Sequence, residues 1–112
     1  MHYHHQGVVN VPLNSIVEIH FIGLVTPIQI ALHINNRRIT PNINLTIEIK
    51  EETTIKWIVI PFKKGTWEYQ VIIKSNDQPV WGKKFIIDQN LYSCESITFS
   101  VTDEINFSIA PA

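Results

Sequence analysis

The sequence contains little cysteine, no long apolar run and no marked excess of either charge. A single cysteine in 112 residues, Cys94, excludes an intramolecular disulfide and agrees with a reducing compartment. No apolar run approaches the roughly 20 residues of a membrane-spanning helix, and the N-terminus lacks the charged-then-apolar pattern of a secretory signal. We therefore expect no membrane insertion and a cytoplasmic protein, with export without a signal peptide left open.

Other absences narrow the function classes. The net charge is −1 and the charged residues are scattered, so no basic stripe exists to neutralise phosphates and nucleic acid is not an expected partner. The sequence shows no Ser/His/Asp set, paired carboxylates or metal-ligand spacing, so we expect no enzyme, no catalytic residue, no metal and no cofactor. Cys94 has no histidine or other base close in sequence and is interpreted as a plain thiol.

Three histidines, His2, His4 and His5, stand near the N-terminus. Neutral imidazoles are common ligands of divalent metals, but no acidic or thiol companion lies nearby. We interpret residues 1–7 as a flexible arm, with metal binding as the alternative.

Isoleucine, valine, threonine and aromatic residues are abundant, and side chains of this shape favour strands. The length fits one domain over residues 1–112. Apolar and polar residues alternate in short segments, and residues 51–54 read as a hairpin turn. The predicted strands lie at about 15–22, 27–37, 43–50, 55–59, 67–73, 80–87, 96–102 and 104–109. Together these features predict an all-β fold of two antiparallel sheets packed as a sandwich.

The most informative predicted strand covers residues 27–37, and Asn35 and Asn36, with Pro41 and Asn42, supply the turn chemistry that ends it. In an extended strand, Ile28, Ile30, Leu32 and Ile34 face one side, and the side chains of His33, Asn35 and Arg37 leave the other. An imidazole, a carboxamide and a five-donor guanidinium on a rigid sheet suit the hydroxyl groups of a sugar. The alternative is a sheet face that is polar only because water covers it.

The segment Ile30–Arg37 also resembles the signature of the galectins, the S-type lectins, in which an apolar lead is followed by His-x-Asn-x-Arg. Residues 61–65 resemble the Pro-Phe-x-x-Gly turn of the same family. The resemblance implies a galectin-like jelly roll that binds β-galactoside-containing glycans without a metal or cofactor.

The resemblance also implies roles for individual residues. His33, Asn35 and Arg37 would bind the galactose hydroxyls, helped by Asn44 or by the competing Asn42. Two tryptophans compete for the stacking position, and Trp57 is preferred to Trp81. Glu48 would orient Arg37, because the acid that follows the family's tryptophan is missing here; an ordinary exposed glutamate is the alternative.

Two functions therefore remain in competition. A shallow lectin site binds in the range of about millimolar to tens of micromolar, so a homodimer through sheet edges or a sheet face would supply the needed strength. The second function is a protein–protein interaction module on a galectin-like or Ig-like sandwich that has lost sugar binding. Retention on lactose-agarose, abolished by Arg37→Ala, would distinguish the two.

Overall fold

The computed structural model describes residues 2–24, 28–61, 65–88 and 92–102. These residues form nine strands and no helix. The strands are β1 (His2–Pro12), β2 (Ser15–Ile22), β3 (Ile28–Ile34), β4 (Arg37–Ile39), β5 (Asn44–Ile49), β6 (Thr53–Pro61), β7 (Thr66–Ser75), β8 (Gln78–Asp88) and β9 (Tyr92–Thr102).

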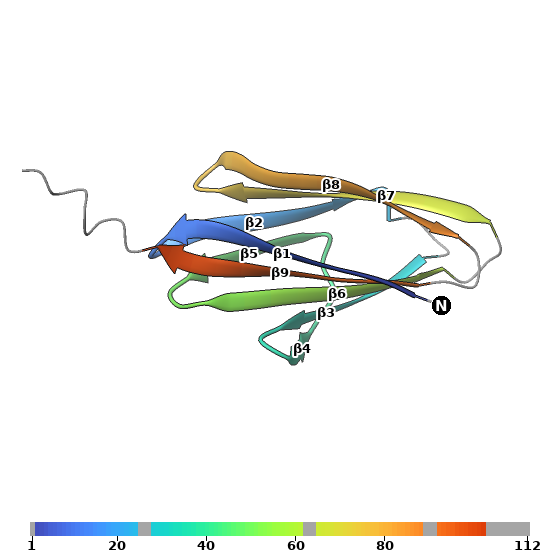
Figure 1. Ribbon diagram of the computed structural model, residues 1–112, viewed down its shortest axis with the longest axis horizontal. Helices are drawn as coiled ribbons and strands as arrows, with labels where there is room; N and C mark the ends of the chain where they lie inside the picture. The colour runs from blue at the N-terminus through green and yellow to red at the C-terminus, as the bar shows by residue number, and fades with distance from the viewer. Residues whose placement is uncertain (1, 25–27, 62–64, 89–91, 103–112) are drawn as a thin grey trace, which may run out of the picture.

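The strands form two sheets, which Figure 1 shows as two layers. The five-stranded sheet has the order β1-β9-β6-β3-β4, and the four-stranded sheet has the order β5-β2-β7-β8. All pairs are antiparallel except β1 with β9, which is parallel. The predicted all-β, two-sheet sandwich is confirmed, with one parallel pair at an edge.

The core forms because alternate side chains of each strand point between the layers. In β2, the side chains of Val17, Ile19 and Phe21 are buried. Trp57 of β6 and Tyr69 of β7 are buried to the same extent and come from opposite sheets. Period-two alternation in the sequence therefore corresponds to the inner and outer faces of the two sheets.

The predicted strand at 27–37 is wrong from Asn35 onward. It is two strands, β3 and β4, joined by a turn at Asn35 and Asn36. Both asparagines have positive φ, 50° and 67°, as type I′ hairpin turns require. Asparagine tolerates this left-handed conformation better than most residues, so the chain reverses inside the segment that was expected to be continuous.

Two further expectations are corrected. Residues 2–7 are not an arm but the first half of β1, and they pair with Tyr92–Ile97 of β9. The segments 43–50 and 55–59 do not form a hairpin, because β5 pairs with β2 in one sheet and β6 pairs with β3 and β9 in the other. The strand predicted at 104–109 lies outside the described residues.

Candidate functional site

Two of the side chains predicted to bind galactose, His33 and Arg37, leave the β3–β4 hairpin on opposite faces, whereas Asn35 and Arg37 line one shallow depression with Ile34 and Ile39. His33 is paired with Arg38, whereas Arg37 is paired with Ile34. Directly paired residues of an antiparallel ladder point to the same face, and consecutive residues point to opposite faces. His33 and Arg37 therefore lie on opposite faces of the five-stranded sheet, and the single polar surface that was predicted for them is not formed.

Asn35 stabilises the turn. Its N–H donates to the carbonyl of Thr54 at 2.8 Å, and its Oδ1 accepts from the N–H of Thr54 at 2.8 Å. The carboxamide thus extends the β3–β6 ladder by one residue. The neighbouring His33 ring is half-buried, and among the described residues its buried Nδ1 has no hydrogen-bond partner.

Trp57 lies in the core, with 0% of its surface exposed. Its ring meets Phe21 and Phe85 edge-on, with centroids 5.5 and 6.2 Å away. Its indole N–H donates to the hydroxyl of Tyr69 at 3.1 Å. A ring enclosed in this way presents no open face on which a sugar could stack.

Asn44 and Glu48 belong to β5, in the other sheet. The Oδ1 of Asn44 lies 2.7 Å from Nδ1 of His20 and is available to accept a hydrogen bond from that ring. The backbone N–H of Asn44 donates to Oδ1 of Asn42. Glu48 forms an exposed ion pair with Lys50 at 3.8 Å. The residues predicted for one sugar site are therefore divided between the two sheets.

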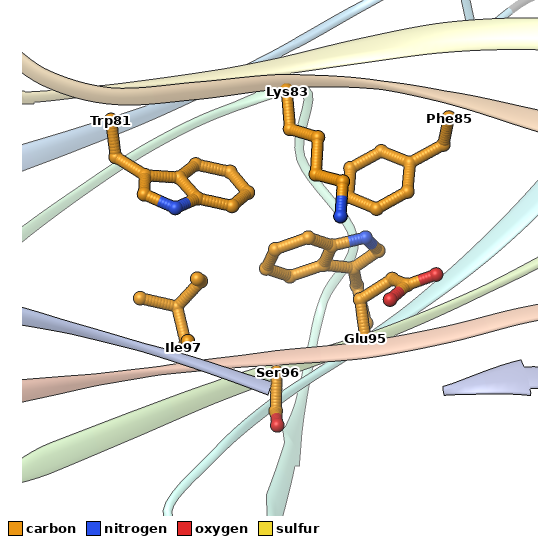
Figure 2. A pocket seen from close by; sticks show the side chains of 8 residues that line it. Trp81, Lys83, Phe85, Glu95, Ser96 and Ile97 are labelled. Atoms are coloured by element: carbon orange, nitrogen blue, oxygen red, sulfur yellow. The ribbon is translucent and has the colours of Figure 1, made fainter. Parts of the chain in front are cut away.

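A different set of side chains surrounds a pocket between the sheets, shown in Figure 2. We call it the edge pocket, because it includes residues of β1 and β8, which are edge strands of their sheets. Its volume is about 140 Å³. It is lined by Gly7, Trp57, Trp81, Lys83, Phe85, Glu95, Ser96 and Ile97.

Strand register explains why these residues meet. Trp81, Lys83 and Phe85 are alternate residues of β8, and Phe85 is paired with the buried Tyr69 of β7. The row that contains Lys83 therefore points between the sheets. In β9, Glu95 occupies the corresponding inward row and is only 2% exposed. One lysine and one glutamate thus interrupt two otherwise mainly apolar rows that face each other.

This interruption is a signal that the sequence already holds. A charged residue at an apolar position of an alternating strand marks a place where a charge points inward. The sequence prediction left Trp81 undecided between burial with Phe85 and Ile87 and an exposed rim, and it did not propose Lys83 or Glu95 as site residues. Recognising the site also requires the pairing of strands from two sheets, which alternation within one strand does not show.

A chain of hydrogen bonds leads to Glu95. The indole N–H of Trp57 donates to the Tyr69 hydroxyl, which lies 2.9 Å from Oγ of Ser93. The Ser93 hydroxyl donates to Oε2 of Glu95, so Tyr69 must donate to Ser93. Burial raises the pKa of Tyr69 well above its ordinary value, which keeps the phenol protonated. Each donor therefore points toward the carboxylate, which ends the chain as an acceptor.

Lys83 brings a positive charge to the same pocket. Its Nζ lies 5.5 Å from the centroid of the Phe85 ring, within the range of a cation–π contact. Figure 2 shows this side chain extending from β8 into the pocket, with its ammonium directed to the space between Phe85 and Glu95.

Gly7 keeps β1 close to this pocket. A Cβ at Gly7 would lie 2.8 Å from Cδ1 of Ile97 and 3.8 Å from Nε1 of Trp81. The first distance is shorter than real Cβ contacts, so a side chain there would displace Ile97 and occupy space beside the indole.

Within the described part of the chain, no three His, Cys, Asp or Glu side chains cluster as metal ligands. The side chains of His2, His4 and His5 lie outside the described residues. The same part of the chain holds no helix that is long and apolar enough to cross a bilayer.

No protein-family model matches the chain, and no curated protein or solved structure is significantly similar to it.

Proposed function

We propose that this domain is a non-catalytic protein-binding module whose edge pocket holds one side chain of its partner. The observation that carries the proposal is a pocket of about 140 Å³ that combines aromatic walls with a buried carboxylate. Concave, mainly apolar sites with a few convergent polar groups are the usual form of binding sites in proteins.

The size of the pocket favours a side chain over a glycan. An apolar cavity of about 150 Å³ accommodates one molecule of benzene. The edge pocket is of that size, which suits one side chain and would not enclose a disaccharide such as lactose. Galactoside binding stays a prediction from the sequence, and the positions of His33, Arg37 and Trp57 do not favour it.

The position of the pocket favours a protein partner. β1 and β8 end their sheets in the described part of the chain, and both contribute side chains or backbone to the pocket. An extended segment of a partner can pair with an edge strand through its backbone while one of its side chains enters a neighbouring pocket. The homodimer expected from the sequence, through sheet edges or a sheet face, also belongs among the partners to be tested.

Peptide-display selection tests this proposal directly. Peptides are selected on the wild-type domain and then compared for binding to Trp81→Ala, which removes the half-buried indole of the pocket, and to Trp67→Ala, which removes a half-buried indole elsewhere. We expect peptides that bind the wild type and Trp67→Ala but lose about tenfold or more in affinity for Trp81→Ala. Equal binding to all three, or retention of the wild type on lactose-agarose with no selected peptide, would overturn the proposal.

A further inference from the structure

We infer that the side chain held by the edge pocket is an organic cation, a lysine or methylated lysine, which enters in place of the domain's own Lys83. The inference rests on the proposed function and adds the chemical class of the ligand.

The walls of the pocket are suited to a cation. The rings of Trp81 and Phe85 line it, and the face of an aromatic ring attracts positive charge. The domain itself provides an example, because the Lys83 ammonium already lies 5.5 Å from the centre of the Phe85 ring. Rings that hold one ammonium group in this way can hold another of the same chemistry.

The base of the pocket supplies the opposite charge. Glu95 is 2% exposed and accepts from Ser93, at the end of the hydrogen-bond chain that begins at Trp57. A buried carboxylate is favourable only where positive charge or hydrogen-bond donors reach it. A neutral apolar group that displaced the Lys83 ammonium would leave the pocket without a positive charge near Glu95. A ligand with its own ammonium group would replace that charge.

Exchange with Lys83 follows from its position in the pocket. Lys83 lines the pocket with its ammonium over the Phe85 ring, so a cation held on the same ring takes the place of that ammonium. That exchange is feasible because Lys83 is exposed, lies on an edge strand and has a flexible four-carbon stem. Lys83 is therefore an internal competitor, and its removal should strengthen binding.

The chain offers a matched control for this expectation. Lys84 is the next residue, is exposed, and does not line the pocket. Lys83→Ala and Lys84→Ala change the net charge of the domain equally. A difference between them therefore reports on the pocket and not on long-range attraction of a cation to the domain.

The experiment is a titration of the ¹⁵N-labelled domain with two molecules of the same shape, choline and the uncharged 3,3-dimethylbutan-1-ol. The readout is the indole N–H signal of Trp81, assigned with Trp81→Phe. We expect choline to bind at least about tenfold more tightly than the alcohol. We also expect Lys83→Ala to bind choline several-fold more tightly than the wild type, while Lys84→Ala binds it as the wild type does.

A capped lysine, Nα-acetyl-lysine methylamide, serves as the second probe. It should move the same Trp81 signal, and the effect should be lost in Glu95→Gln provided that its far-UV spectrum is native.

Several results would overturn the inference. They are equal affinity for choline and its neutral analogue, equal behaviour of Lys83→Ala and Lys84→Ala, and no response of the Trp81 signal to either choline or the capped lysine. Self-association of Lys83→Ala without any response to choline would also overturn it, since an inward lysine on an edge strand then serves only to prevent strand pairing. Selected peptides that need the pocket but no cationic residue would contradict the inference and leave the proposed function intact.

Discussion

The β3–β4 hairpin and the edge pocket differ in how their polar side chains are assembled. In the hairpin, His33, Asn35 and Arg37 are close in sequence, but a turn with two positive φ angles places His33 on the face opposite that of Arg37. In the edge pocket, Lys83 and Glu95 come from strands of different sheets, and the packing of those sheets brings them together. Residues that are close in sequence thus do not form a common site in the hairpin, whereas residues from two packed sheets do so in the edge pocket.

The comparison also separates two roles of polarity. Polar residues that alternate with apolar ones on a strand are expected on any sheet face that contacts water. A charged group inside an apolar row must be compensated, because burial of an uncompensated charge is costly. Glu95, which is 2% exposed, belongs to the second kind, and its position is therefore the more informative one.

The largest predicted effect concerns Trp57, which the sequence prediction placed at a sugar surface. Trp57→Ala should lower the free energy of unfolding by about 3–5 kcal/mol, because it leaves a cavity among Phe21, Tyr69 and Phe85. Urea denaturation measures this. Trp81→Ala, at a half-buried ring, should lower it by less than half as much. A loss below about 1 kcal/mol for Trp57→Ala would indicate that the ring is exposed, and it would contradict the contrast between the buried Trp57 and the half-buried Trp81.

A second prediction concerns the hydrogen-bond chain at the base of the edge pocket. Tyr69→Phe should lower the free energy of unfolding by about 1–3 kcal/mol at neutral pH, because the buried Trp57 N–H loses its acceptor and Ser93 loses its donor. Tyr92→Phe, at a ring that is 38% exposed, is the control and should change it little.

The same pair of variants has a predicted pH dependence. The pKa of Tyr69 is raised in the folded state, so its contribution to stability is fully present below the unfolded value of about 10. As the pH rises from about 10 toward the folded value, the unfolded state loses this proton first, and the stability of the wild type falls. The difference in stability between the wild type and Tyr69→Phe should therefore narrow above about pH 10. A difference that stays constant to pH 11 would show that the phenol is not shielded from solvent.

A third prediction tests the role of Asn35 in the hairpin. Asn35→Ala should lower the free energy of unfolding by about 1–2 kcal/mol, because alanine is strained at a φ of 50° and cannot accept from the Thr54 N–H. Asn36→Gly should leave stability unchanged or raise it slightly, since glycine suits the second turn position. The reverse order of the two variants would contradict the assigned turn.

The smallest predicted effect is at Arg37. Its side chain is exposed on the face opposite that of His33, so Arg37→Ala should change the free energy of unfolding by no more than about 0.5 kcal/mol. Binding of pocket-dependent peptides should also be unchanged. Loss of binding to any ligand in this variant would restore a functional role to the hairpin.

Parts of the fold were predictable because the relevant information is local. The strand at 15–22 matches β2 to the residue, since Val17, Ile19 and Phe21 alternate without interruption between turn residues. β1 was missed because its first half, residues 2–7, has little apolar alternation and is held by parallel pairing with β9. Asn35 and Asn36 were recognised as turn residues, but the predicted strand was extended through them to residue 37, whereas the apolar alternation and β3 both end at Ile34.

The candidate site was less predictable because it depends on sheet packing. Trp81, Lys83 and Phe85 share one face by simple alternation, which the sequence shows. That Glu95 lies across from them follows only from the positions of β8 and β9 in separate sheets. A charged residue in an apolar row is visible in the sequence, but its partner in another sheet is not.

One measurement tests the location of the site most directly. Backbone and indole ¹H–¹⁵N signals of the wild-type domain are followed during separate titrations with choline and with lactose. The edge pocket predicts that choline moves the signals of Trp81, Lys83 and Glu95 and leaves residues 33–38 unchanged, and that lactose moves neither group. Shifts at residues 33–38 in lactose, with Trp81 silent in choline, would contradict the account.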